Sequence, residues 1–137
     1  MIKKKIINIL MKNGKKQTLE KNLFKILKLL NKNFNKDTKN LIKNFLIQSS
    51  IFVNLRNVKR GKSNVIGIPF ILKHSLRIFY ALKRIKNIIE NQSNTFCKNF
   101  KEELFKTLNK KSENLKQKED LYKQVFLKKS FSYYRWF

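Results

Sequence analysis

Several residue types are scarce in this chain, and each scarcity excludes something. The 137 residues contain one cysteine, one proline and three glycines. A single cysteine, Cys97, excludes an internal disulfide and fits a reducing compartment. It lies beside Phe96 and Phe100 in a helical pattern, so we interpret it as an apolar packing group rather than a reactive thiol. The longest apolar run, Ile66 to Leu72, has seven residues, and roughly 20 are needed to span a bilayer. We therefore expect no membrane insertion.

Groups that perform catalysis or bind metals are also scarce. The one histidine, His74, has no aspartate, glutamate or cysteine near it in the sequence, so it cannot by itself form a metal site or a triad. The eight acidic residues stand mostly among lysines, where pairing or solvation explains them. We interpret Glu119 and Asp120 as acidic residues at the N-terminal end of a helix, where the helix dipole favours them. The sequence therefore predicts no catalytic residue, no metal and no cofactor, and indicates that the protein is not an enzyme.

Positive charge dominates what is present. The 33 lysines and arginines against eight acidic residues give a formal net charge of +25. Such a charge would repel itself in a compact monomer, so a polyanionic partner is expected, with nucleic acid as the leading candidate. The alternatives are a nonspecific basic nucleic-acid-binding protein and a protein that coats an anionic membrane surface. A disordered basic tail is excluded, because 42% of the residues are hydrophobic.

Hydrophobic residues recur at helical spacing along most of the chain. Five stripes are visible: Leu19, Leu23, Leu27 and Leu30; Leu41 and Phe45; Ile78, Leu82, Ile85 and Ile89; Phe96, Phe100, Leu104 and Leu108; and, more weakly, Leu121 and Val125. A short apolar segment from Ile6 to Met11 precedes them. We predict amphipathic helices that bury these stripes against one another as a bundle core.

Capping residues predict where some helices begin and end. Asp37 and Thr38 precede the second stripe, Ser75 the third, and Ser93 to Thr95 the fourth. Gly14 follows the segment from Ile6 to Met11, and we expect it to adopt a left-handed conformation that ends a first helix.

The region between the second and third stripes has the pattern of a β-hairpin. Ile51, Val53 and Leu55 alternate with other residues, a basic and polar segment follows at 56–64, and 65–72 is apolar and β-branched around Pro69. A proline in the returning strand fits an edge strand. We predict a hairpin arm at about 51–72, with cations near its tip that enter a nucleic-acid groove or lie along phosphates. A solvated loop is the alternative. These cations are Arg56, Lys59, Arg60 and Lys62.

The C-terminal segment combines cations with aromatic rings, because a charged helical pattern runs into Tyr133, Tyr134, Arg135 and Trp136. It resembles the closing segment of the bacterial-type small-subunit ribosomal protein seven family, which runs Lys-Lys-Arg-Glu-Asp and ends in Phe-Ala-His-Tyr-Arg-Trp. The matching positions are Lys116, Glu119, Asp120, Lys123, Phe131, Tyr134, Arg135 and Trp136.

Two further segments are similar to the same family. Asn13-Gly14-Lys15-Lys16 matches the family's Asp-Gly-Lys-Lys, and Val53 to Pro69 is similar to its hairpin with an indel of about one residue. The helical segment from Arg77 to Asn87 resembles a family helix that carries two arginines and a tryptophan, with Tyr80 near the tryptophan's place. The resemblance extends over roughly residues 6–136.

The resemblance implies a fold and a role. It implies a mainly α fold: a single helical-bundle domain of five to six helices over 1–137 with one protruding β-hairpin. It also implies binding to the 3′ major domain of small-subunit rRNA, help in assembling the head, small-subunit proteins nine and eleven as neighbours, and mRNA and exit-site tRNA near the hairpin. The RNA-binding residues that we predict are Lys15, Lys16, Arg56, Lys59, Arg60, Lys62, Arg77, Tyr134, Arg135 and Trp136. For Trp136, packing back onto the domain is the alternative.

Composition also bears on where the protein acts. Lysine, asparagine, isoleucine and phenylalanine, which A/T-rich codons encode, are abundant. Because family-like sequence begins by Ile7, we expect no cleavable presequence. We predict an organelle-encoded mitochondrial protein, with a plastid-type organelle or an A/T-rich bacterium as alternatives.

Overall fold

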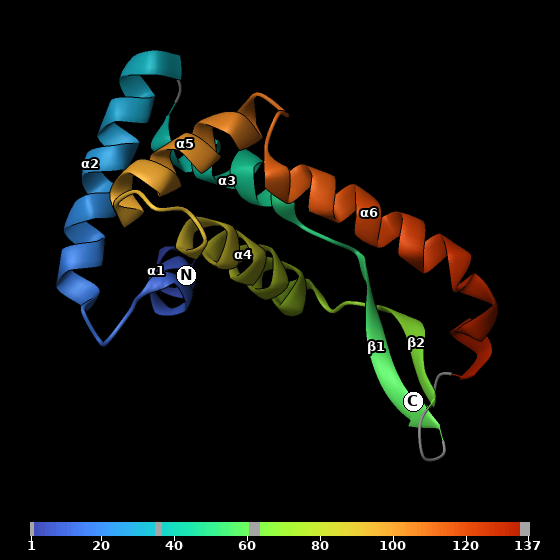
Figure 1. The fold of residues 1–137 in the computed structure, drawn as a ribbon. Helices are drawn as coiled ribbons and strands as arrows, with labels where there is room; N and C mark the ends of the chain where they lie inside the picture. The colour runs from blue at the N-terminus through green and yellow to red at the C-terminus, as the bar shows by residue number, and fades with distance from the viewer. Residues whose placement is uncertain (1, 35–36, 61–63, 135–137) are drawn as a thin grey trace.

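The computed structural model describes residues 2–34, 37–60 and 64–134, and in these ranges the chain is mainly helical with one β-hairpin (Figure 1). The elements are α1 (Ile2–Leu10), α2 (Lys16–Phe34), α3 (Thr38–Ser49), β1 (Val53–Arg60), β2 (Asn64–Ile71), α4 (His74–Glu90), α5 (Phe96–Leu108), α6 (Glu113–Leu127) and a closing 3-10 helix, η1 (Lys129–Tyr134). The predicted mainly α fold with a hairpin is confirmed.

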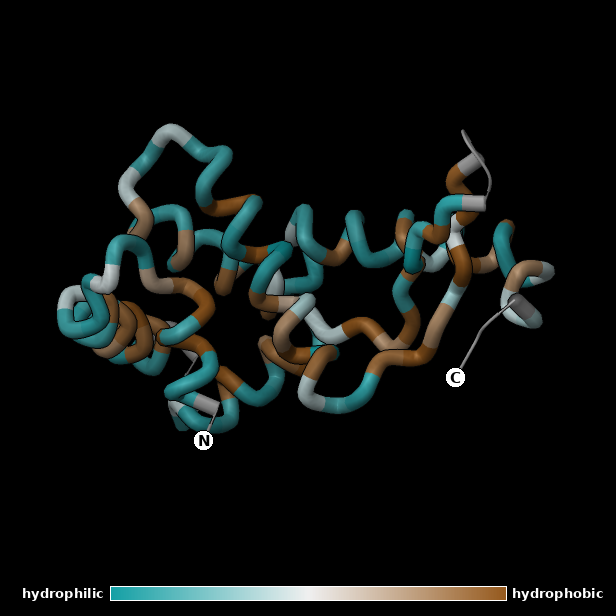
Figure 2. Tube along the Cα trace, turned by 90° about the horizontal axis from the view of Figure 1, so that it is seen from below, coloured by the Kyte–Doolittle hydropathy of each residue, from teal (hydrophilic) through white to brown (hydrophobic). Residues whose placement is uncertain are grey.

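The core lies where α1 to α5 meet, with α4 at its centre. Leu82 and Ile85 of α4 have no exposed surface, and Leu30 of α2, Phe45 of α3 and Phe100 of α5 are also buried. These residues belong to the predicted stripes, so helical periodicity identified the core correctly. Figure 2 shows the alternation of hydrophobic and hydrophilic residues along this helical part of the trace. The rings of Phe45 and Phe100 meet edge to face, with centroids 6.4 Å apart.

The turn between α1 and α2 uses left-handed backbone. Gly14 has a φ of 69°, as predicted, and Asn13 has a φ of 50°. Because α1 already ends at Leu10, these residues shape the turn that leads into α2 and are not the immediate cap of α1. Glycine adopts this conformation without the steric cost that a Cβ brings.

Two predicted helix starts are correct in position and two predictions are wrong. Asp37 and Thr95 precede α3 and α5, although neither side chain makes a capping hydrogen bond. Ser75 was predicted to precede α4, but the helix begins at His74, after the extended residue Lys73. Ser75 is therefore the second residue of the helix and not its cap. Glu119 and Asp120 lie in the middle of α6, which begins at Glu113, so the helix dipole at an N-terminus does not explain them.

The sequence did not predict where α6 begins, because few apolar residues mark the first turns of this helix. Its cap is Ser112, whose side chain accepts a hydrogen bond of 3.3 Å from the backbone nitrogen of Leu115. The buried residue within α6 is Asn114, which is polar.

The hairpin is antiparallel, with register running from Val53 opposite Ile71 to Arg60 opposite Asn64. The predicted hairpin is confirmed, with its strands at Val53–Arg60 and Asn64–Ile71 inside the predicted range of 51–72. Pro69 stands opposite Leu55 in a sheet of two strands, so it occupies an edge strand, where the missing N–H is tolerated.

The hairpin extends away from the helical body, and α6 runs out alongside it (Figure 1). The two are joined where the hairpin begins, since the backbone nitrogen of Phe52 donates a 3.1 Å hydrogen bond to the Tyr122 hydroxyl of α6. At the far end of α6, η1 contacts β2. η1 and the hairpin therefore occupy the same end of the molecule.

Candidate nucleic-acid interface

The hairpin presents cations on both of its faces. Arg56 stands opposite Ile68, and Lys59 stands opposite Val65. Residues three apart on a strand point to opposite faces, so one cation lies on each side of the ribbon. Both side chains are exposed. A two-stranded ribbon of this kind can enter a groove or lie along a phosphate backbone.

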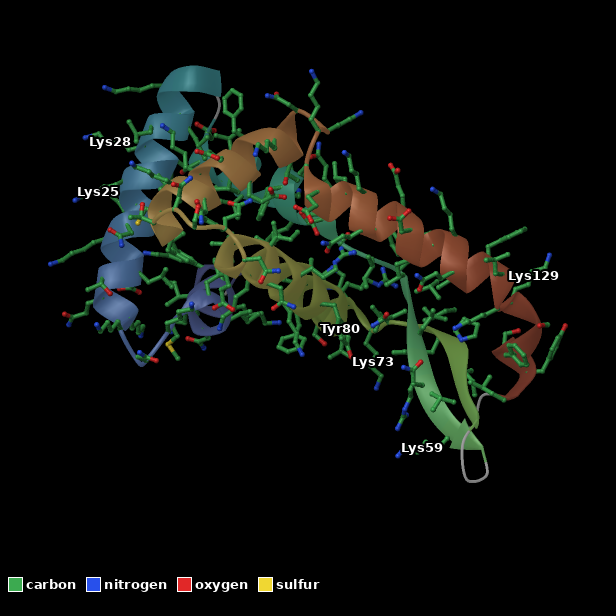
Figure 3. All side chains as sticks on the ribbon, in the orientation of Figure 1. Lys25, Lys28, Lys59, Lys73, Tyr80 and Lys129 are labelled. Atoms are coloured by element: carbon green, nitrogen blue, oxygen red, sulfur yellow. The ribbon has the colours of Figure 1, made fainter. Side chains whose placement is uncertain are left out.

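The same side of the molecule continues from the hairpin onto α4. Figure 3 shows Lys59, Lys73 and Tyr80 following one another along the lower edge of the molecule, from β1 to α4. Lys73 is exposed and immediately precedes α4, while Tyr80 is half-buried and packs edge to face on Phe79 with centroids 5.6 Å apart. Sequence reasoning did not select Lys73, because its position beside the hairpin depends on how the chain turns into α4.

Arg77 is engaged by the protein itself. Its Nε donates a 2.9 Å hydrogen bond to the carbonyl oxygen of Leu72, and its guanidinium lies 4.6 Å from the centre of the Phe52 ring. Such contacts fix the guanidinium in place. Arg77 therefore joins α4 to the base of the hairpin, and an RNA contact would use the donors that these two groups leave.

Lys15 and Lys16 lie at the other end of the molecule. Both are exposed, Lys15 at the end of the connection from α1 and Lys16 as the first residue of α2. This connection stands opposite the hairpin in the long direction of the fold (Figure 1). The predicted RNA-binding residues therefore form two groups and not one patch. A ligand that touches both groups must extend along the molecule, as a folded RNA can.

The end of α6 and η1 bring a cation and aromatic rings next to the hairpin. Tyr133 of η1 is 93% exposed, and Phe126 near the end of α6 is 67% exposed. The Nζ atom of Lys129 lies 4.6 Å from the centre of the Phe126 ring. Exposed aromatic faces beside ammonium groups suit the stacking of unpaired bases.

Several predicted site residues fall outside what the structure describes. Lys62, Arg135 and Trp136 lie beyond the described ranges, and for Arg60 and Tyr134 only the backbone is described, at the ends of β1 and η1.

Acidic residues neutralise little of the positive charge. Across residues 2–34, 37–60 and 64–134, two ion pairs are formed: Lys12 with Glu90 at 3.0 Å, and Lys123 with Asp120 at 3.4 Å.

Lysines also cover surface that the sequence did not single out. Figure 3 shows Lys25 and Lys28 pointing outward from α2, next to Phe24, which is 70% exposed.

The described part of the chain offers no group of three histidine, cysteine, aspartate or glutamate side chains that could hold a metal. One carboxyl is buried, since Glu103 of α5 is 2% exposed. Burial raises the pKa of the Glu103 carboxyl. It lies among packed helices rather than in a cleft open to substrate.

Among the helices that the structure describes, none is both long and apolar enough to cross a membrane.

Comparison with known proteins agrees with the sequence resemblance. A family described as ribosomal protein S7p/S5e matches residues 1–126. The small ribosomal subunit protein uS7 of Geotalea uraniireducens is 26% identical over 133 residues, which are 96% of this chain and 85% of that protein. The uS7 protein of Wigglesworthia glossinidia brevipalpis is 28% identical over the same coverage.

A helical body with a basic hairpin, a charge of +25 and a family match over nearly the whole length fit one another. The chain belongs to the ribosomal protein S7p/S5e family and is a structural component of the small ribosomal subunit, not an enzyme.

Proposed function

We propose that this chain binds the 3′ major domain of small-subunit rRNA and helps to assemble the head of the subunit. The observation that carries the proposal is the ribbon with Arg56 on one face and Lys59 on the other, both exposed, projecting from a helical body. Neither forms an ion pair within the described residues. Their charges are thus available to phosphates, with release of counterions on binding.

The proposed contact residues are those selected from the sequence: Lys15, Lys16, Arg56, Lys59, Arg60, Lys62, Arg77, Tyr134, Arg135 and Trp136. We add two exposed residues: Lys73, which follows the hairpin, and Tyr133 of η1, the element that contacts β2. The lysines and arginines neutralise phosphates and fix orientation, while the aromatic rings stack on unpaired bases. The proposed protein neighbours are small-subunit proteins nine and eleven, and the hairpin is proposed to lie near mRNA and exit-site tRNA.

The test is a titration of the full chain against the 3′ major domain of small-subunit rRNA over a range of salt concentrations. Excess tRNA serves as competitor, and vesicles of anionic lipid are titrated in parallel. We expect tight binding that survives the competitor. Equal binding to tRNA and rRNA would leave a nonspecific basic protein, and binding to the vesicles alone would indicate a membrane-surface protein.

We further propose that the ribosome concerned is mitochondrial and that the gene is organelle-encoded. The supporting observation is a composition rich in residues with A/T-rich codons. The relatives named above are bacterial, so a plastid-type organelle and an A/T-rich bacterium are the competing sources. Mapping the gene to a genome and locating the protein by fractionation distinguish the three.

A further inference from the structure

A cavity of about 390 Å³ opens at the end of the molecule that lies opposite the hairpin. It lies between the connection from α1 to α2 and the connection from α4 to α5. Leu10, Leu19 and Ile89 give it apolar lining, and Phe96 adds an aromatic side chain. Its size is within the range of pockets that hold small ligands, about 300–1,000 Å³.

An ion pair lines the same cavity. Lys12 Nζ lies 3.0 Å from Glu90 Oε1, and both residues belong to the cavity wall. Glu90 is the last residue of α4, where the helix dipole disfavours a carboxylate, and no basic residue stands in the last turn of α4 to compensate. The positive charge that compensates Glu90 comes from Lys12, in the connection from α1 to α2. The chain has eight acidic residues against a net charge of +25. Glu90 is one of them, and it lies in the cavity wall although the end of α4 disfavours its charge.

Besides the negative end of α4 at Glu90, the cavity also has positive groups that can meet an anion. Lys15 lines it, as do residues at the beginnings of α2 and α5. Neither helix has an acidic residue in its first turn, so the positive ends of both dipoles are unneutralised there. A ligand with a flat apolar part, a polar edge and a phosphate matches this lining, and a nucleotide has all three.

We propose that this cavity receives one unstacked guanine nucleotide of the rRNA, which makes the inference dependent on the proposed function. The Watson–Crick edge of guanine presents the acceptor O6 followed by two donors, N1–H and N2–H. The Lys12 ammonium donates and the two oxygens of the Glu90 carboxylate accept, in the same order. Adenine, cytosine and uracil each present at most one donor group to the carboxylate and leave one partner unmatched. Phe96 supplies an aromatic surface to the base, and Lys15 meets the phosphate.

The inference adds recognition of base identity to an interface whose other proposed contacts, with phosphates and by stacking on bases, do not read sequence. Contacts from Arg56 and Lys59 on an exposed ribbon carry no sequence information by themselves. A single unpaired guanine held in a cavity would supply such information, as bulged and looped bases do in RNA recognition.

The experiment follows the methyl NMR signals of Leu10, Leu19 and Ile89 in the full chain during titration with GMP, AMP, CMP and IMP. We expect GMP to bind roughly tenfold more tightly than AMP or CMP, and IMP, which lacks the N2 amine, to bind more weakly than GMP. Glu90→Gln should reduce the preference for GMP over AMP to about one, since it removes one of the two carboxylate acceptors. The matched control is Glu102→Gln, which alters an exposed glutamate of α5 and should keep the preference.

Equal shifts for all nucleotides, no shift with any of them, or a preference that survives Glu90→Gln would each overturn the inference. Titration of the same preparation with the 3′ major domain separates the two proposals. If that RNA binds above the tRNA competitor while GMP does not bind, only the guanine site is wrong. If the RNA does not bind above the competitor, the proposed function fails whatever GMP does.

Discussion

The guanidinium of Arg84 in α4 donates a 2.8 Å hydrogen bond from Nη2 to the carbonyl oxygen of Ser49, the last residue of α3. Lys118 of α6 donates a hydrogen bond from Nζ to the carbonyl oxygen of the preceding residue, Gln48, also at 2.8 Å. The last carbonyls of a helix lack partners within it and carry the negative end of the dipole. Two basic side chains from separate helices therefore cap α3 as hydrogen-bond donors, so not every lysine and arginine is free to meet a partner.

The Lys118 cap makes stability depend on pH. Burial lowers the pKa of the Lys118 ammonium below 10.5, and the nearby charge of Arg84 lowers it further. Between the folded and unfolded pKa values the unfolded chain binds more protons than the folded chain, so the free energy of unfolding rises with pH in that window. We predict that Lys118→Met flattens this rise on the approach to pH 10.5, as measured by urea unfolding at a series of alkaline pH values.

Lys116→Met is the control for Lys118→Met. It removes an exposed lysine from the same helix and should leave the slope of stability against pH as in the native chain. Identical slopes for Lys118→Met and the native chain would contradict the prediction.

Glu103 of α5 is a buried acidic residue, and we expect its substitution by an uncharged residue to stabilise the fold. Burial raises the pKa of its carboxyl, and the charge of Glu113 adds to the rise against the opposing effects of Asn114, Lys106 and Ser112. Its Oε1 has no hydrogen-bond partner in the described part of the chain. Above the folded pKa the ionised group destabilises the fold, and protonation relieves this as pH falls toward 4.5.

We therefore predict that Glu103→Gln raises the free energy of unfolding at neutral pH by about 1 kcal/mol, on the scale of an unpaired buried polar group. The gain should disappear as the pH approaches 4.5, which thermal unfolding at several pH values can follow. Glu102→Gln changes the exposed neighbour and should have little effect at any pH. A loss of stability in Glu103→Gln at pH 7 would show that the ionised carboxylate is held favourably.

The helices were predictable where apolar side chains mark one face, as in α4 and α5, because burial of that face drives their packing. The start of α6 was not, since Asn114 and not an apolar residue is buried there. The position of Ser75 inside α4 depends on the backbone at Lys73, which is extended without a capping side chain. Local sequence does not fix such a boundary.

Candidate site residues could be selected from the sequence, but how they are arranged and which are occupied by the protein itself could not be predicted. Arg77 and Arg84 look alike in the sequence, yet both guanidinium groups donate to protein carbonyl oxygens. Lys15 and Arg56 both look available, and they lie at opposite ends of the fold. Which cation is occupied and which is exposed depends on contacts between residues far apart in the chain.

One such contact joins the end of α6 to the hairpin. A Cβ added to Gly67 of β2 would lie 2.8 Å from Lys128 Nζ and 3.3 Å from Lys128 Cδ. Because the ammonium is at the end of a flexible side chain, we predict that Gly67→Ala displaces Lys128 and costs less than about 1 kcal/mol. In a Lys128→Ala background the same change should be neutral or stabilising, since alanine suits a strand better than glycine. Urea unfolding of the native chain, the two single variants and the double variant gives the coupling free energy between the two positions. If the two changes in the free energy of unfolding simply add, the contact between Gly67 and Lys128 is contradicted.

The last prediction concerns which lysines meet RNA. Lys59 is exposed on the hairpin and Lys25 points outward from α2, on the far side of the helical body from the hairpin. If the hairpin lies along phosphates, Lys59→Gln should lower affinity for the 3′ major domain several-fold and reduce the slope of log affinity against log salt by about one. Lys25→Gln removes the same charge and should change both quantities less, because it lies away from the proposed contact. Equal effects of the two substitutions in titrations from low to high salt would mean that the chain attracts RNA through its net charge and not through the hairpin.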